Sequence, residues 1–159
     1  MRPFQTIKTL FVSMVLAAAL LAASRLATAA DSPVGTYVSK AANGKPEITM
    51  KIEQWAPGKA KLTYHIQAAG NMVLTIVSSL DGKDAPVLIN GKPTGETMAI
   101  TLIDKLHSST VVKMNGKVFG NSKGTFSPDF KTLTVENDFS SAGGGTHQAG
   151  KSTELWTRQ

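Results

Sequence analysis

The sequence predicts an all-β protein, in which antiparallel strands follow one another in an up-and-down meander and close into a barrel of about eight to ten strands. Two observations support this fold class. Turn dipeptides recur about every 10 to 15 residues, and the segments between them alternate apolar and polar side chains. A period of two is typical of antiparallel strands with one face on a core and the other in water. No window of a dozen residues shows the apolar spacing of an amphipathic helix.

The turn signals combine Gly or Pro with Asn or Asp. Asn-Gly and Asp-Gly tolerate the positive φ values that tight hairpin turns require, so they are strong short-range markers of hairpins. Evenly spaced hairpins favour a meander that closes on itself, because closure leaves no edge strand exposed. The signals lie at Asn43-Gly44, Pro57-Gly58, Gly70-Asn71, Asp81-Gly82, Asn90-Gly91, Asn115-Gly116, Pro128-Asp129 and Gly143-Gly144-Gly145.

Nine or ten strands are predicted between these turns. Residues 46–55 show the alternation well, because Ile48, Met50 and Ile52 share one face. Residues 71–79 differ, since Val73 and Val77 make the second face apolar as well. Either loops or a partner cover that face, with loops the commoner case, or it is an exposed apolar surface. The predicted strands are 34–40, 46–55, 60–68, 71–79, 85–89, 97–104, 109–115, 117–126, 132–139 and 152–158.

Residues 1–30 have the three parts of a cleavable secretion signal. Arg2 and Lys8 make the start basic, residues 10–23 are uncharged and mostly apolar, and small residues follow. The apolar part has 14 residues, whereas a helix needs about 20 to cross a bilayer. We therefore expect a signal-peptide helix that is removed on export; a signal anchor that stays uncleaved is the alternative.

Small residues at −3 and −1 fit cleavage after Ala29 or after Ala30. The expected product is a single domain at residues 31–159 with no stable membrane span. Neither a lipoprotein cysteine nor a twin-arginine pair is present. We therefore expect export through the general secretion route, to the periplasm or out of the cell.

The charge of the exported part argues against a nucleic-acid partner. The whole chain carries a net charge of +6, but residues 1–30 hold three basic residues and no acidic ones, which leaves 14 basic and 11 acidic residues and a net charge of +3. The lysines are scattered, and Arg158 is the one arginine beyond residue 30. Nucleic-acid sites usually gather basic residues on one face. The sequence has no cysteine, which excludes thiol catalysis, disulfides and cysteine-based zinc sites.

An outer-membrane barrel would share the alternation and the signal. Its lipid-facing surface tolerates charge poorly, at about 2–4 kcal/mol for each Lys or Arg at mid-depth. Lys51, Lys61 and Lys113 fall at mid-strand on the polar faces, and the chain ends on Gln159 rather than on an aromatic residue. The sequence therefore favours a barrel in water.

Four segments together resemble small exported bacterial lipocalin-like (calycin-type) domains of uncharacterised function. These segments are Gly35-Thr36-Tyr37, Leu80 to Val87, Phe126 to Val135, and Leu155-Trp156-Thr157-Arg158. The resemblance implies that an aromatic residue of the first strand packs on a basic residue of the last strand and closes the base of the barrel. Tyr37, in place of the family's Trp, and Arg158 would form this pair as a cation–π contact. The pair would be structural.

No catalytic, metal or cofactor site is predicted. His65, His107 and His147 lack the spacing of metal ligands, and we interpret them as independent surface residues. The chain also lacks the Gly-x-Ser-x-Gly turn that holds a nucleophilic serine. Asp81 and Asp84 fall at a turn, where aspartate is favoured for local hydrogen bonds. We therefore expect a protein that is not an enzyme.

The methionines suggest a binding function. Beyond the signal, all four fall at inward positions of different predicted strands, and Met is common on adaptable apolar binding surfaces. We predict that a small apolar or amphipathic ligand lies inside the barrel. The predicted ligand-binding residues are Met50, Ile52, Leu62, Tyr64, Met72, Leu74, Met98, Ile100, Met114 and Val135.

The alternative is that these residues only fill the core. The protein would then be an interaction or inhibitor module of the cell envelope that acts through its loops. A cavity of several hundred Å³, typical of ligand sites, would distinguish the two hypotheses. The sequence leaves the oligomeric state open.

Overall fold

The computed structural model describes residues 32–40, 46–67, 70–140, 147 and 149–159. The predicted signal at 1–30 and the predicted turns at Asn43-Gly44 and Gly143-Gly145 lie outside these residues. The described strands are β1 (Gly35–Lys40), β2 (Pro46–Ala56), β3 (Lys59–Ile66), β4 (Met72–Ser78), β5 (Asp81–Ile89), β6 (Lys92–Leu102), β7 (His107–Met114), β8 (Lys117–Phe126), β9 (Thr132–Phe139) and β10 (Gly150–Arg158).

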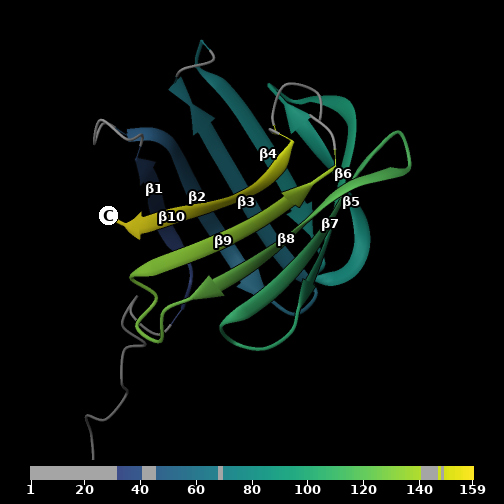
Figure 1. Cartoon of the computed structure of the whole chain (residues 1–159). Coiled ribbons are helices and arrows are strands. Elements are labelled where there is room, and N and C mark those ends of the chain that lie inside the picture. Colours follow the sequence, from purple (N-terminus) through teal and green to yellow (C-terminus); the bar gives the residue numbers. More distant parts are fainter. Residues whose placement is uncertain (1–31, 41–45, 68–69, 141–146, 148) are drawn as a thin grey trace, which may run out of the picture.

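These ten strands form a closed barrel. Each strand pairs antiparallel with the next one in the sequence, and β10 pairs with β1. Figure 1 shows this closure, with the yellow β10 beside the dark β1. The predicted all-β meander that closes on itself is therefore confirmed. Within the described residues every strand has a neighbour on both sides, so the backbone bonds of an edge strand are not left exposed.

Two hairpins use the predicted Asn-Gly turns directly. Asn90 and Gly91 have φ values of 49° and 78°, and Asn115 and Gly116 have 49° and 79°. Two successive positive φ values define the type I′ turn, whose twist matches that of the strands it joins. These turns connect β5 to β6 and β7 to β8.

The Asp81-Gly82 turn lies elsewhere than the sequence predicted. The chain reverses at Ser79 and Leu80, where Leu80 has a φ of 59°. Asp81 and Gly82 instead begin β5, and the register with β6 shifts between Asp81 and Asp84. Asp81 and Gly82 form a β-bulge here instead of a hairpin turn. The Asp81 carboxylate stabilises it by accepting hydrogen bonds from the Ser79 hydroxyl and the Lys83 amide. As a result β5 begins at residue 81 rather than 85. Separately, β6 begins at 92 rather than 97, directly after the Asn90-Gly91 turn.

The predicted contact between Tyr37 and Arg158 is confirmed. The Arg158 guanidinium carbon lies 5.9 Å from the centre of the Tyr37 ring, and its Nη1 and Nη2 donate to the carbonyl oxygens of Ser32 and Val34. The Tyr37 hydroxyl donates to the carbonyl oxygen of Phe130 at 3.1 Å. The pair therefore fastens the first and last strands to the β8–β9 turn and closes this end of the barrel.

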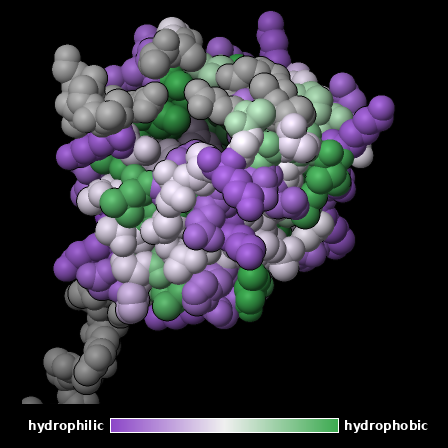
Figure 2. All heavy atoms as spheres, viewed as in Figure 1, coloured by the Kyte–Doolittle hydropathy of each residue, from purple (hydrophilic) through white to green (hydrophobic). Residues whose placement is uncertain are grey.

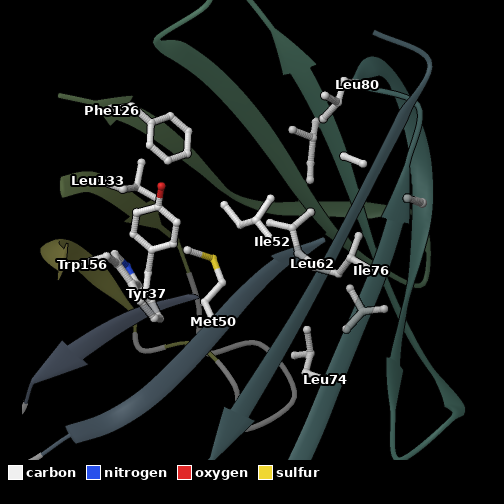
Figure 3. Packing of buried hydrophobic residues seen from close by; sticks show 14 of the residues in the cluster. Tyr37, Met50, Ile52, Leu62, Leu74, Ile76, Leu80, Phe126, Leu133 and Trp156 are labelled. Carbon is white, nitrogen blue, oxygen red and sulfur yellow. The ribbon is translucent and has the colours of Figure 1, made fainter. Parts of the chain in front are cut away.

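The barrel interior holds a large apolar cluster. Figure 3 shows Tyr37 and Met50 pointing across the interior towards Phe126, Leu133 and Trp156. A smaller cluster lies apart from it, with Val112, Phe119 and Phe139 buried and Met98 and Met114 packed against them. Met98 packs against both clusters.

The outer surface is mainly polar. Figure 2 shows one face on which hydrophilic and intermediate residues predominate and apolar residues are scattered. On β4, Val73 is half-buried, but Val77 is 53% exposed, so the described loops do not cover the apolar outer face that the sequence indicated there.

Candidate ligand cavity inside the barrel

A cavity of about 170 Å³ lies inside the barrel. Residues from β2, β3, β4, β6, β7, β8, β9 and β10 line it, together with His147. The volume is below the several hundred Å³ that are typical of ligand sites and that the ligand hypothesis requires. It is nevertheless close to that of an apolar cavity of about 150 Å³ that binds benzene in another protein. The interior is therefore not completely filled, and its space suits a small molecule.

Eight of the ten predicted ligand-binding residues line this cavity. Met114 and Met72 are not among its lining residues. Met114 packs on the smaller cluster with Phe119 and Phe139, and Met72 is half-buried at the start of β4, opposite Ile66. The eight that meet at the cavity are Met50, Ile52, Leu62, Tyr64, Leu74, Met98, Ile100 and Val135.

One wall of the cavity is apolar. It comes from β2, β3, β4 and β6, whose inward residues follow the alternation visible in the sequence. Figure 3 shows Ile52 and Leu62 side by side on this wall, with Leu74 nearby on β4. Flexible methionines at positions 50 and 98 complete the wall, and such side chains adapt to guests of different shape.

The opposite wall mixes polar and apolar residues, and sequence reasoning missed its polar groups. It contains Ser108, Thr110, Ser122, Asn137 and Glu154, which lie on β7, β8, β9 and β10. On these strands polar residues often face both inwards and outwards, so the alternation of apolar and polar residues is weak.

In β10 one apolar residue faces outwards and one charged residue faces inwards, against the usual pattern. Leu155 is 59% exposed on the outer face, whereas Glu154 and Trp156 line the cavity. The period of two could have located Glu154 inside, because it lies two residues before the buried Trp156.

A chain of hydrogen bonds fixes the polar wall. The Ser122 hydroxyl donates to Asn137 Oδ1 at 2.7 Å, and Asn137 Nδ2 donates to Glu154 Oε1 at 3.0 Å. The indole Nε1 of Trp156 donates to Glu154 Oε2 at 3.1 Å. Each carboxyl oxygen of Glu154 therefore accepts one bond from the protein. Because a carboxylate oxygen can accept about two bonds, each keeps capacity for a further donor.

The negative charge of Glu154 affects the ionisation of Tyr64, which also lines the cavity. Its ring lies edge-on to that of Trp156, with centres 6.0 Å apart. Burial raises the pKa of the Tyr64 hydroxyl well above its usual range, and the negative charge of Glu154 raises it further. Both effects favour the neutral form of the phenol.

His147 borders the cavity next to a buried carboxylate. Its Nε2 lies 3.0 Å from Oε1 of Glu96, a residue that is 2% exposed. The His147 ring packs on Phe139 and Phe119, with centres 4.6 and 5.7 Å apart. The interpretation of the histidines as independent surface residues is therefore wrong for His147. Sequence reasoning missed this pair, because its partners lie 51 residues apart.

The two other histidines are exposed. His65 faces outwards from β3, and His107 Nδ1 lies 2.8 Å from the exposed Asp104 carboxyl group. Among the described residues no group of three or more His, Cys, Asp or Glu side chains is placed to hold a metal ion. In the same part of the chain no helix has the length and apolar character needed to cross a bilayer.

Comparisons of the chain with protein-family models, with curated proteins and with solved structures found no match. The cavity itself can enclose a small apolar group against β2, β3, β4 and β6, and it can accept hydrogen bonds from a polar group at β10.

Proposed function

We propose that this protein binds one small amphipathic molecule inside its barrel and does not transform it. The observation that carries the proposal is the cavity of about 170 Å³ with one apolar wall and a group of polar side chains on the opposite wall. Concave sites that combine apolar lining with a few placed polar groups are typical of small-molecule binding.

Energetics favour binding over a core that is simply filled. A cavity that stays empty costs stability at about 24 cal/mol per Å³, so a void of about 170 Å³ costs at most about 4 kcal/mol. That cost is a large part of the usual stability of a domain, about 5–15 kcal/mol. A ligand that fills the space offsets this cost, which supports a role for the cavity.

We propose binding rather than catalysis because of the way the polar groups of the cavity are hydrogen-bonded to one another. Ser122, Asn137 and Glu154 bond to one another in a chain that ends on a carboxyl group. Nucleophilic catalysis needs a hydroxyl or thiol next to a base that can take its proton. The Ser122 hydroxyl instead donates to an amide oxygen, which is a poor base.

A relationship to lipocalin-like domains and export belong to the same proposal. The closed meander and the contact between Tyr37 and Arg158 support the relationship, although the barrel has ten strands rather than the eight of lipocalins. The basic and apolar segments of residues 1–30 support export. Mass measurement of the protein from its host would test export, because a mature chain should begin after Ala29 or Ala30.

Native mass spectrometry of the protein purified from its host tests the binding proposal first, because a resident molecule would add its mass. A titration with benzyl alcohol, a neutral compound of suitable size, tests it directly. The sequence contains two tryptophans, and Trp55 and Trp156 both line the cavity. We expect their fluorescence to change saturably as the compound enters.

Two variants on β9 locate the bound molecule. Val135→Phe places a large ring in the cavity and should abolish the fluorescence change. Thr134→Phe adds the same ring on the outer face and should leave it intact, because neighbouring strand residues point to opposite faces. Equal binding by both variants, or no saturable change in the wild type, would contradict the proposal and favour the interaction-module alternative.

A further inference from the structure

The charge of the polar wall determines which small molecules the cavity can accept. Glu154 lines the cavity with a carboxyl group whose two oxygens accept bonds from Asn137 and Trp156. Both protein partners are N–H donors, so the site is arranged around an acceptor. Neither oxygen has to donate a proton to the protein.

Positive side chains do not balance this carboxyl group. None of the described residues that line the cavity is Lys or Arg. His147 is the one basic side chain among the described lining residues, but its Nε2 lies 3.0 Å from a different carboxyl group, that of Glu96. The raised pKa of Tyr64 agrees with a negative interior, because the charge of Glu154 contributes to it.

An anionic ligand would therefore meet repulsion. A small carboxylate would lose its hydration and would face Glu154 with no cation beside it, which is costly in a site of low polarity. A ligand ammonium would instead form a charge-assisted hydrogen bond with Glu154, and such bonds are about twice as strong as neutral ones. A ligand hydroxyl can donate the same bond without the charge.

We propose that the natural ligand carries an ammonium or another hydrogen-bond-donating group that binds the Glu154 carboxyl group, beside an apolar part of about the size of a benzene ring. Small anions of the same size are rejected. This inference rests on the proposed function and adds the chemical class of its ligand.

Three compounds of nearly the same shape test it: benzylamine as the cation, benzyl alcohol as the neutral donor and benzoate as the anion. Binding to the full protein is measured at neutral pH by tryptophan fluorescence and by calorimetry. We expect benzylamine to bind most tightly, benzyl alcohol next and benzoate not measurably. The difference between benzylamine and benzoate should be at least about tenfold, as expected for one charge-assisted hydrogen bond.

Two substitutions separate a local contact from a general effect of charge. Glu154→Gln keeps the shape of the side chain but removes its charge, so benzylamine should lose about tenfold in affinity, while benzyl alcohol changes less. Glu136→Gln makes the same change on the exposed outer face of β9 and should leave the order and the affinities unchanged. Thermal unfolding checks that both variants are folded.

The outcomes distinguish this inference from the proposed function. Benzoate binding as tightly as benzylamine in the wild type would overturn the inference alone, and this comparison needs no variant. An equal loss of benzylamine affinity in Glu154→Gln and Glu136→Gln would also overturn it, because general charge attraction would then be the cause. Failure of all three compounds to bind at millimolar concentration would overturn the proposed function and the inference together.

Discussion

The ring of Phe139 lies directly over the backbone of Gly120 on the neighbouring strand. The two residues are register partners in β9 and β8, and a Cβ built on Gly120 would lie 1.8 Å from Phe139 Cδ1. Phe139 in turn packs on Phe119 and on the ring of His147. The absence of a side chain at position 120 therefore lets Phe139 lie flat at this end of the barrel and hold His147 next to Glu96.

Gly120→Ala should destabilise the protein by about 1–3 kcal/mol, the usual cost of overpacking a core. Urea unfolding measures the change. Gly124→Ala is the matched control on the same strand, since its Cβ would meet chiefly the Ser108 hydroxyl, at 2.7 Å, which can rotate away. Phe139→Leu should recover part of the loss in the Gly120→Ala background. Equal stabilities of the two alanine variants would contradict the steric explanation.

Arg158→Met should lower the stability by about 2–3 kcal/mol. It removes the contact with the Tyr37 ring and the bonds to the Ser32 and Val34 carbonyls but keeps an apolar side chain of similar length. Arg158→Lys should recover little of this loss, because a lysine lacks the planar fork that reaches two carbonyls at once. Lys131→Met, at an exposed ion pair with Asp129, should change the stability by less than about 1 kcal/mol. Chemical denaturation of the three variants provides the test.

The stability should fall at alkaline pH because of the two tyrosines. Burial raises the pKa of Tyr37 and of Tyr64 above the ordinary value of 10.0. Above pH 10 the folded state therefore keeps protons that the unfolded state releases. The stability that depends on the two neutral hydroxyl groups is complete below pH 10 and is lost as the pH rises above it. A tenfold difference in ionisation constant corresponds to about 1.4 kcal/mol.

Absorbance of the tyrosinate ion measures this titration. In the folded protein we expect it to appear only above the range of a free tyrosine. Between about pH 9 and 11, a range that spans the ordinary tyrosine pKa, Tyr64→Phe should lose less stability than the wild type. Because both proteins have the same lysines, the titration of the lysines cancels in this comparison. Tyrosinate absorbance that develops near pH 10 without unfolding would show that the phenols are hydrated.

The His147–Glu96 pair should contribute much more stability than the His107–Asp104 pair. The distances are similar, at 3.0 and 2.8 Å, but Glu96 is 2% exposed whereas Asp104 lies on the surface. An ion-paired hydrogen bond shielded from water is stronger than one on the surface, where water competes and screens the charges. We expect His147→Ala to cost about 2–3 kcal/mol and His107→Ala less than about 1 kcal/mol. Comparable losses in thermal unfolding would indicate that burial does not strengthen the pair.

Much of the fold could be predicted because its signals are local. Alternation such as that of Ile48, Met50 and Ile52 identifies a strand and its inward face at the same time. Asn90-Gly91 and Asn115-Gly116 locate hairpins because their backbone angles are rare for other residues. Asp81-Gly82 misled the prediction of the β5 boundary, since turn chemistry also serves a bulge, and the sequence does not distinguish these uses.

The candidate site could be predicted for most of its apolar lining but not for its polar groups. Methionines and aliphatic residues at inward positions led to eight residues that line the cavity. Met114 follows the same pattern but packs against the smaller cluster of Val112, Phe119 and Phe139. The pattern assigns a side chain to a face of its strand, but it does not place that side chain along the barrel axis.

The sequence by itself determined the fold class, the order of the strands and the apolar half of the interior, because these follow from backbone preferences and from a period of two along each strand. Tertiary structure alone decided the cavity volume, the polar wall that ends at Glu154, and the contact of His147 with Glu96. These features join residues from different strands and depend on barrel closure and side-chain packing. Which side chains meet across a closed sheet depends on its register and curvature, and neither is written in a single strand.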